Sequence, residues 1–286
     1  MYSIQTKSNF SLNINGNILI LDRPHIMGIL NLTPDSFYDG GQNSNQSIII
    51  DKIAKMIDEG ADIIDIGAMS SRPYSEEIPV IEELNRVRSI LPLIKKEFPN
   101  LILSIDTYRA EIAEYAADNG VSIINDITAG KKDEKILYIA KKYRTPYIAM
   151  HMLGMPQTMQ INYSYENILS EIIFFFSERL QVFAKIGLSD VILDVGFGFG
   201  KSIEDNYQLL KNLSYFNSLN CPMLVGISRK SMIYKPLNLS PKEALNGTTA
   251  LHFEALRQGA HILRVHDVKE AKQVVDLFAI YKKANT

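Results

Sequence analysis

The amino-acid sequence predicts a (β/α)8 TIM barrel preceded by a short β-hairpin. From His25 onward, a short apolar run followed by a longer amphipathic stretch recurs eight times. The runs are rich in Ile, Leu and Val with little alternation, which is typical of parallel strands covered on both faces. Several amphipathic stretches close on a glycine, such as Gly60, Gly120 or Gly187, that suits the left-handed end of a helix. Repeated units of this kind favour one barrel over two separate domains.

The order of the elements follows from the same patterns. The predicted barrel strands are residues 25–31, 61–67, 101–106, 122–126, 146–151, 191–194, 223–228 and 261–266. The clearest predicted helices are residues 46–59, 76–98, 109–118 and 165–186. Residues 1–22 are expected to form the hairpin, with strands at 3–6 and 16–21, because Asn15-Gly16 is a favoured two-residue turn. This hairpin should act as a lid or plug, and the chain 1–286 should form a single domain whose barrel spans 23–286.

The composition excludes several classes of protein. Lys and Arg number 30 against 32 Asp and Glu, and the formal net charge of -2 gives no overall attraction to nucleic acid or to an anionic membrane. The single cysteine, Cys221, excludes an internal disulfide and is expected to be a small buried side chain of low reactivity. No stretch reaches the roughly 18 apolar residues of a membrane span, and the first ten residues lack the apolar run of a signal peptide. We therefore expect a cytoplasmic protein without nucleic-acid or membrane partners.

Polar residues terminate almost every apolar run. They fall at or just past the predicted carboxyl ends of the strands, at Asn31, Asp106, Asn125, His151, Asp194, Lys230 and His266. Barrel enzymes place their active sites at this end. The alternative for each position is a polar residue that merely marks the start of a solvated loop, but the complete set favours an active site.

Three of these residues suit a flat, nitrogen-rich ligand. Asp106, Asn125 and Asp194 stand on strands from which their side chains can converge on the barrel axis. A carboxylate accepts two parallel hydrogen bonds from an amidine-like edge, so the trio fits a heterocycle rich in N–H donors. A carboxylate-bound metal is the competing interpretation. Asp62 and Asp65 have no assigned function, although Asp65 is placed to face the barrel interior.

The last two units indicate an anion site. Residues 228–231 read Ser-Arg-Lys-Ser and residues 264–266 read Arg-Val-His, and the loops after these strands are the usual phosphate-binding place of the fold. The alternative for Lys230 is a Schiff-base lysine. The glycine-rich residues 194–202 do not match the spacing of a nucleotide-binding loop; their glycines allow tight turns, and Phe199 offers an aromatic face to a flat ligand. Residues 31–41 predict a mobile flap, and residues 70–73 a second anion-binding loop.

Segments that resemble those of one known protein family follow one another over almost the whole chain. They are residues 27–41, 64–67 with 70–73, 104–109, 124–127, 150–156, 194–201, 225–231 and 264–267. On these residues the sequence resembles the dihydropteroate synthase family, the folate-pathway enzymes inhibited by sulfonamides. Several segments also suit the related methyltetrahydrofolate methyltransferases, which bind a pterin in the same kind of barrel.

The resemblance implies a transferase that joins para-aminobenzoate to hydroxymethyl-dihydropterin pyrophosphate, with Mg²⁺ bound to the leaving group. The leaving group departs first, and the arylamine then captures a pterin carbocation. The catalytic positions are Asp106, Asp194, Lys230 and Arg264, and together with Asn125 they hold the pterin. The pyrophosphate positions are Asn31, Ser71, Arg72, Arg264 and His266, with Asn31 as the Mg²⁺ ligand. The para-aminobenzoate positions are Thr33, Phe37, Ser71, Arg72, Pro73, Phe199, Ser228 and Lys230.

Two rivals remain at this point, and one further partner is expected. The rivals are a pterin-binding methyltransferase and a catalytically silent pterin-binding paralogue. Val195 stands where the family commonly has proline, and Met69 and Ser71 replace the commoner Glu and Thr. Ser71 keeps a hydroxyl, so the implied catalysis stands, whereas loop rigidity and sulfonamide affinity do not follow from the resemblance. The resemblance also implies a homodimer, for which residues 241–257 and 268–283 offer helices that can pair with a second copy.

Overall fold

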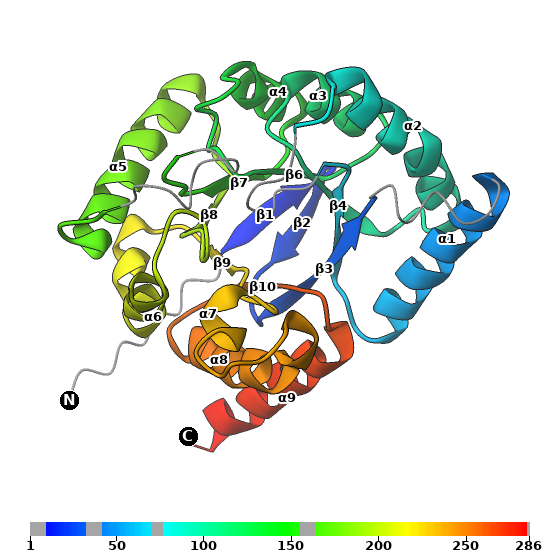
Figure 1. Ribbon diagram of the computed structural model, residues 1–286. Coiled ribbons are helices and arrows are strands. Elements are labelled where there is room, and N and C mark those ends of the chain that lie inside the picture. Colours follow the sequence, from blue (N-terminus) through cyan, green and yellow to red (C-terminus); the bar gives the residue numbers. More distant parts are fainter. Residues whose placement is uncertain (1–9, 33–41, 70–76, 155–163, 285–286) are drawn as a thin grey trace.

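The computed structural model describes residues 10–32, 42–69, 77–154 and 164–284, which form a closed barrel of parallel strands (Figure 1). The strands follow one another around the barrel in chain order, and the last pairs with the first. They are β3 (His25–Asn31), β4 (Ile63–Gly67), β5 (Ile102–Asp106), β6 (Ile123–Asp126), β7 (Tyr147–Met150), β8 (Val191–Asp194), β9 (Met223–Val225) and β10 (Ile262–Val265). The predicted (β/α)8 barrel is confirmed, and each strand lies within its predicted range.

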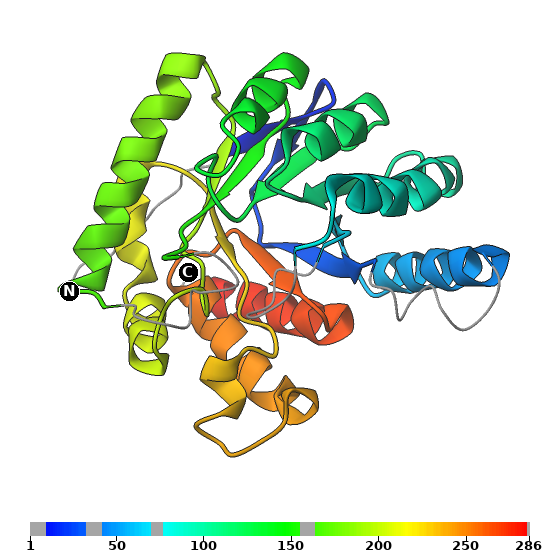
Figure 2. The ribbon, with the colours of Figure 1, turned by 45° about the horizontal axis from the view of Figure 1, so that its top comes forward.

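Helices surround the barrel on its outer side (Figures 1 and 2). They are α1 (Gln42–Asp58), α2 (Val80–Glu97), α3 (Ala110–Asp118), α4 (Lys135–Tyr143), α5 (Ile168–Ile186), α6 (Ile203–Lys211), α7 (Ser231–Tyr234), α8 (Leu245–Arg257) and α9 (Val268–Lys283), with 3₁₀ turns η2 (Leu213–Leu219) and η3 (Pro241–Glu243). Helix α2 begins four residues later than predicted, because Pro79 adopts an extended backbone before it. Helix α5 begins after Asn167, whose side chain accepts the Ser170 N–H at 3.1 Å, and ends at the left-handed Gly187. No helix in the described ranges is both long and apolar enough to cross a membrane.

The N-terminal hairpin is confirmed, and the strand that precedes its turn is 11–14. Strand β1 (Ser11–Ile14) pairs antiparallel with β2 (Asn17–Ile20), and Asn15 and Gly16 form the turn with positive φ angles. A two-residue turn pairs the residues immediately on either side of it, so the partner of 17–20 has to be 11–14. The predicted strand at 3–6 lies outside the described residues.

The hairpin closes the amino-terminal end of the barrel, as the prediction of a plug requires. Side chains alternate along each strand, so every second residue points into the barrel. At the amino-terminal end these inward residues are apolar and pack against hairpin residues in one buried cluster. Its members are Leu12, Ile14, Leu21, Met27, Ile63, Ile123, Ile148, Ile192, Leu224 and Ile262. Any ligand must therefore enter from the opposite end, where the strands finish.

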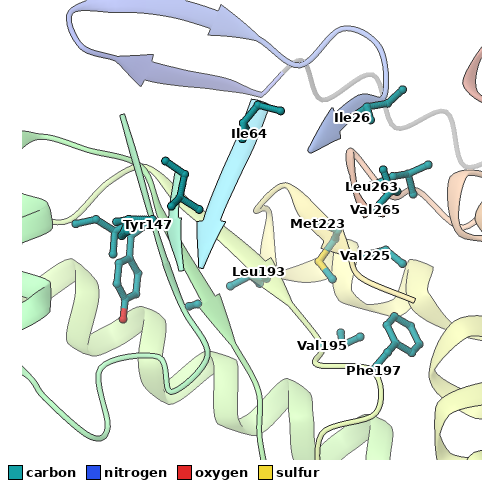
Figure 3. Packing of buried hydrophobic residues seen from close by; sticks show 14 of the residues in the cluster. Ile26, Ile64, Tyr147, Leu193, Val195, Phe197, Met223, Val225, Leu263 and Val265 are labelled. Carbon is teal, nitrogen blue, oxygen red and sulfur yellow. The ribbon is translucent and has the colours of Figure 1, made fainter. Parts of the chain in front are cut away.

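A second buried layer lies between the barrel and its helices. It includes outward-facing strand residues such as Ile64, Leu193 and Leu263, shown in part in Figure 3. The ring of Tyr147 contacts the ring of Phe183 on α5 edge-on, with centroids 5.5 Å apart. Each aliphatic side chain buried in this way contributes about 1.5–3 kcal/mol. This layer makes the strands a rigid support for the polar residues at their ends.

Candidate active site

Polar residues replace apolar ones in the next layer of the barrel interior. Four of these polar residues lie two positions after a strand residue of the apolar cluster that packs against the hairpin. Because side chains on a strand alternate with a period of two, these four also point into the barrel. The fifth, Asp106, pairs in register with Asn125 on the neighbouring strand. The set comprises Asp65 on β4, Asp106 on β5, Asn125 on β6, Asp194 on β8 and Arg264 on β10. Four of these five were predicted as pterin-holding positions.

Arg264 links two strands across the barrel. Its Nε donates to Asp65 Oδ2 at 2.7 Å, and its Nη2 donates to Asp106 Oδ2 at 2.7 Å. Asn125 donates its Nδ2 to the same Asp65 oxygen at 2.9 Å. The guanidinium is therefore held in one plane by two carboxylates, with Asn125 completing the network.

Burial determines the charges in this network. It raises the pKa of Asp106 to about 7, against the opposing charge of Arg264. It also raises the pKa of Asp194, although Lys230 and the Gly196 N–H favour the ionised form. Burial alone lowers the pKa of Arg264, but the carboxylates of Asp65 and Asp106 outweigh it and hold the pKa above its ordinary value. The guanidinium stays charged and balances the buried carboxylates.

Asp65 is the functional candidate that sequence reasoning left unassigned. It is 0% exposed, and its second oxygen, Oδ1, has no hydrogen-bond partner among the described residues. A sequence feature does indicate that Asp65 points into the barrel. It lies two positions after Ile63, a member of the apolar cluster that packs against the hairpin, in an otherwise apolar strand. Its neighbours in sequence are isoleucines rather than a polar loop, so it does not mark a strand end. A carboxylate in the middle of a buried strand is costly unless paired, and Arg264 is its partner.

Replacing Asp65 by asparagine is expected to lower kcat/KM about tenfold, because one of the two charged acceptors of Arg264 becomes a neutral amide oxygen. The matched control is Asp62→Asn. Asp62 binds Arg23 and the Ile26 N–H at the amino-terminal end of the barrel, so its loss should reduce stability alone. Steady-state kinetics and a melting curve of each variant test this; equal kinetic constants for both variants and the parent chain would show that Asp65 has no part in the site.

Lys230 lies over the glycine-rich segment after β8. Its Nζ donates to the Phe197 carbonyl oxygen and lies 4.7 Å from the centroid of the Phe199 ring. Asp194 is anchored in the same segment, since its Oδ1 accepts the Gly196 N–H at 2.8 Å. Gly196, Gly198 and Gly200 all have positive φ angles, as the tight-turn interpretation predicts. The structure thus brings Asp194, Phe199 and Lys230 together.

The loops after β9 and β10 bring Ser228 into contact with His266 and pair Arg229 with Asp267. The Ser228 hydroxyl lies 3.1 Å from His266 Nδ1, so these two predicted residues touch. Arg229, which the sequence groups with the anion-binding cations, instead has φ +55° and forms a bidentate pair with Asp267 at 2.7 and 2.8 Å. Its Nη1 also donates to carbonyl oxygens of η3, including that of Lys242 at 2.8 Å. Arg229 therefore joins two loops, and its donors are engaged there.

Of the remaining predicted positions, Asn31, His151 and Cys221 are described by the structure and five others are not. Asn31 ends β3, and its Oδ1 would lie 3.3 Å from a Cβ placed on Gly67 of β4, so its amide lies at the carboxyl end of the barrel. His151, predicted at the same end, is buried and contacts the ring of Phe175 edge-on. Cys221 is half-buried, and burial raises the pKa of its thiol to about 11, in line with the low reactivity predicted. Five predicted positions lie outside the described residues: Thr33, Phe37, Ser71, Arg72 and Pro73.

Comparison with known proteins identifies the family. Residues 27–266 match the family described as "Pterin binding enzyme". The dihydropteroate synthase of Escherichia coli K12 is 42% identical over 262 residues, which cover 91% of this chain and 92% of that protein. The chain belongs to the dihydropteroate synthase family. A Yersinia pestis dihydropteroate synthase solved with a sulfonamide drug matches with a TM-score of 0.89 at 38% identity, covering 96% of this chain and 100% of that one. The Xanthomonas albilineans dihydropteroate synthase with 4-aminobenzoic acid matches with a TM-score of 0.86 at 35% identity, covering 96% and 98%.

Proposed function

We propose that the carboxyl end of this barrel condenses para-aminobenzoate with hydroxymethyl-7,8-dihydropterin pyrophosphate to give 7,8-dihydropteroate and pyrophosphate. The observation that carries the proposal is the convergence of Asp106, Asn125, Asp194, Lys230 and Arg264 at one end of a barrel whose other end is plugged. Membership of the dihydropteroate synthase family supports the same reaction.

The buried carboxylates recognise the pterin in this proposal. Asp194 accepts two parallel hydrogen bonds from the amino-pyrimidine edge, while Asn125 offers both a donor and an acceptor to the ring. Arg264, held in one plane by Asp65 and Asp106, lies against the flat face of the ring. An aromatic heterocycle with several N–H groups satisfies this set better than an aliphatic substrate does.

The reaction requires positioning and charge stabilisation rather than a protein nucleophile. The bond between the pterin methylene carbon and the diphosphate oxygen breaks, and its electron pair leaves with the diphosphate. The arylamine nitrogen of para-aminobenzoate then bonds to the methylene carbon and loses a proton. His266, which is exposed beside Ser228, and Arg264 are placed to favour negative charge on the departing group.

The donor set at this end fits a magnesium ion that is shared with the substrate. Among the residues that the structure describes, no group of three His, Cys, Asp or Glu side chains could hold a metal on its own. Mg²⁺ commonly keeps several waters and takes one or two protein oxygens together with substrate phosphates. The Asn31 amide oxygen would hold the ion, which when bound would neutralise charge on the diphosphate.

Para-aminobenzoate and sulfonamides are the proposed ligands of the outer part of the site. The described residues assigned to them are Phe199, Ser228 and Lys230. Thr33, Phe37, Ser71, Arg72 and Pro73 are assigned to the same ligands and lie outside the described residues. Related enzymes were solved with a sulfonamide drug and with 4-aminobenzoic acid, which supports these two classes of ligand. Lys230 can pair with a carboxylate or stack its charge on an aromatic ring, as it does with Phe199.

A homodimer is the proposed assembly. Helices α8 and α9 pack together, and the outer face of α9 exposes Leu277, Ile280 and Tyr281. Contiguous exposed apolar residues of this kind are typical of a subunit interface. Light scattering on the purified chain gives the mass directly, and the mass of one chain would contradict the proposal.

The pH dependence of the reaction is expected to report Lys230. Burial lowers the pKa of its ammonium to about 8, although Asp194 partly opposes this. Asp106 and Arg264 also face the group, the first favouring and the second opposing its charge. If the charged form is required, kcat/KM falls about tenfold per pH unit as the pH rises above about 8. Lys230→Arg should remove this fall, because a guanidinium stays charged; the same fall in the variant would assign it to another group.

Pyrophosphate release separates the synthase from its two rivals. The purified chain is incubated with Mg²⁺ and the pterin diphosphate, with and without para-aminobenzoate. Release that depends on the arylamine supports the proposed reaction. Saturable pterin binding without release would point to a silent paralogue or to a methyltransferase.

A further inference from the structure

The amino group of Lys201 is buried among neutral acceptors, and burial lowers its pKa to about 7 although the charge of Asp194 favours the ammonium form. The residue is 4% exposed, and its Nζ donates to the carbonyl oxygens of Gly196 and Phe199 at 3.0 Å each. The same nitrogen lies 3.0 Å from His151 Nδ1 and 3.3 Å from the His151 carbonyl oxygen. Burial, reinforced by the charge of Lys201, lowers the pKa of His151 to about 2, so its ring is neutral and Nδ1 accepts. A lysine is almost never fully buried unless its amino group is paired, and here neutral oxygens and an imidazole nitrogen supply the partners.

The four contacts join two segments that follow neighbouring strands. His151 comes directly after β7, whereas Gly196 and Phe199 belong to the segment 195–202 between β8 and α6. The two backbones approach too closely for a side chain between them. A Cβ on Gly196 would lie 1.9 Å from the His151 carbonyl oxygen, and one on Gly200 would lie 2.4 Å from that of Leu153. The ammonium of Lys201 sits at this crossing and satisfies carbonyl oxygens from both sides.

Segment 195–202 also determines where Lys230 lies. The Phe197 carbonyl oxygen accepts a hydrogen bond from Lys230 Nζ, and the Phe199 ring lies beside the same atom. Gly198 provides the space for the Lys230 side chain, since a Cβ there would lie 3.3 Å from Lys230 Cδ. A displacement of this segment therefore moves both Phe199 and Lys230.

Asp194 is placed differently. It is the last residue of β8, and the ladders on both sides fix it, through Met150 of β7 and Leu224 of β9. Its backbone carbonyl oxygen also accepts the His151 N–H at 2.9 Å. The backbone of Asp194 is thus fixed by strand pairing, whereas its carboxylate keeps one contact to segment 195–202 through the Gly196 N–H.

We propose that Lys201 is a positioning residue that holds segment 195–202 against the end of β7 and thereby places Phe199 and Lys230 for the arylamine substrate. Its effect falls mainly on para-aminobenzoate, because Phe199 is assigned to the arylamine alone, whereas Lys230 is assigned to both substrates and Asp194 is fixed chiefly by its strand. This inference rests on the proposed function, because it assigns a residue to one of its two substrates.

The test compares the two substrates in Lys201→Met, which keeps the length of the side chain and removes the donors. We expect KM for para-aminobenzoate to rise at least about tenfold while the Kd for the pterin diphosphate changes by less than about threefold. Titration with para-aminobenzoate alone should show the same loss without relying on turnover. Lys201→Gln keeps an amide donor, so its KM for para-aminobenzoate should lie between those of the parent chain and Lys201→Met. If the methionine variant does not fold, the glutamine variant is compared with the parent chain instead.

The control is Ile94→Ala, which opens a cavity under α2, at a distance from segment 195–202 in the chain. It lowers the melting temperature but should leave both substrate constants unchanged. A Lys201→Met variant that melts earlier with both constants unchanged would give Lys201 a purely structural role and overturn the inference. So would an equal loss for pterin and arylamine. A parent chain that binds both ligands and forms no product would instead refute the proposed reaction, leaving the binding comparison valid.

Discussion

Replacing Arg264 by methionine is expected to lower the free energy of unfolding by about 3–5 kcal/mol at neutral pH, as removal of one partner from a buried ion pair does. The side chain is largely buried, and its removal leaves the carboxylates of Asp65 and Asp106 without their shared counter-ion. The loss should shrink as the pH falls, because protonation of one carboxylate removes the repulsion. Denaturant titrations at neutral and mildly acidic pH measure both effects.

Arg257→Met is the matched control for this prediction. Arg257 pairs with Glu254 at 3.3 Å on α8, where both side chains are partly exposed. Surface pairs of this kind contribute about 0–1 kcal/mol, so the control should unfold almost like the parent chain. A loss for Arg264→Met no larger than that of the control would show that the two carboxylates do not depend on the guanidinium. The Arg264 variant should also lose at least about a hundredfold in kcat/KM, since a charged contact to the leaving group is removed.

Replacing Asp194 by asparagine is expected to weaken pterin binding by about ten- to a hundredfold. Each hydrogen bond to a charged group is worth about 1.5–3 kcal/mol net, and the asparagine turns one of two acceptors into a donor. Asp194→Ala should lose at least about tenfold on the same grounds. Equilibrium titration with the pterin diphosphate gives the change, and it is independent of the arylamine.

Asp126→Asn is the appropriate control for Asp194. Asp126 is another fully buried carboxylate at the end of a barrel strand, but its partners are the Tyr147 hydroxyl, Thr128 and the Gly130 N–H. Its replacement should lower stability and leave the pterin Kd unchanged. Unchanged affinity in the Asp194 variant, or an equal loss in both variants, would remove Asp194 from the pterin site.

The barrel was predictable because its strands are short, almost continuously apolar runs that end in polar residues. The hairpin was harder to predict, since Leu12 and Ile14 make only a brief alternation and no composition signal separates them from the residues before. The turn at Asn15-Gly16 was the reliable signal, because a two-residue turn pairs the residues immediately on either side of it.

The site was predictable where a residue both ends a strand and points inward. Asp65 meets only the second condition, so its part in holding Arg264 emerged from the contacts alone. Arg229 shows the opposite error, because a left-handed backbone turns its guanidinium to Asp267 and no sequence pattern predicts that angle. Lys201 belongs to a matching segment, yet its burial between two loops depends on contacts between residues about fifty positions apart.

The measurement that tests the central claim most directly is identification of the product by mass spectrometry. The purified chain is supplied with Mg²⁺, hydroxymethyl-dihydropterin pyrophosphate and ring-labelled para-aminobenzoate, and the reaction is repeated with Asp194→Asn. We predict 7,8-dihydropteroate carrying the full label, formed in step with pyrophosphate by the parent chain and at a strongly reduced rate by the variant. Pyrophosphate released without labelled dihydropteroate, or product formed equally fast by the variant, would contradict the account.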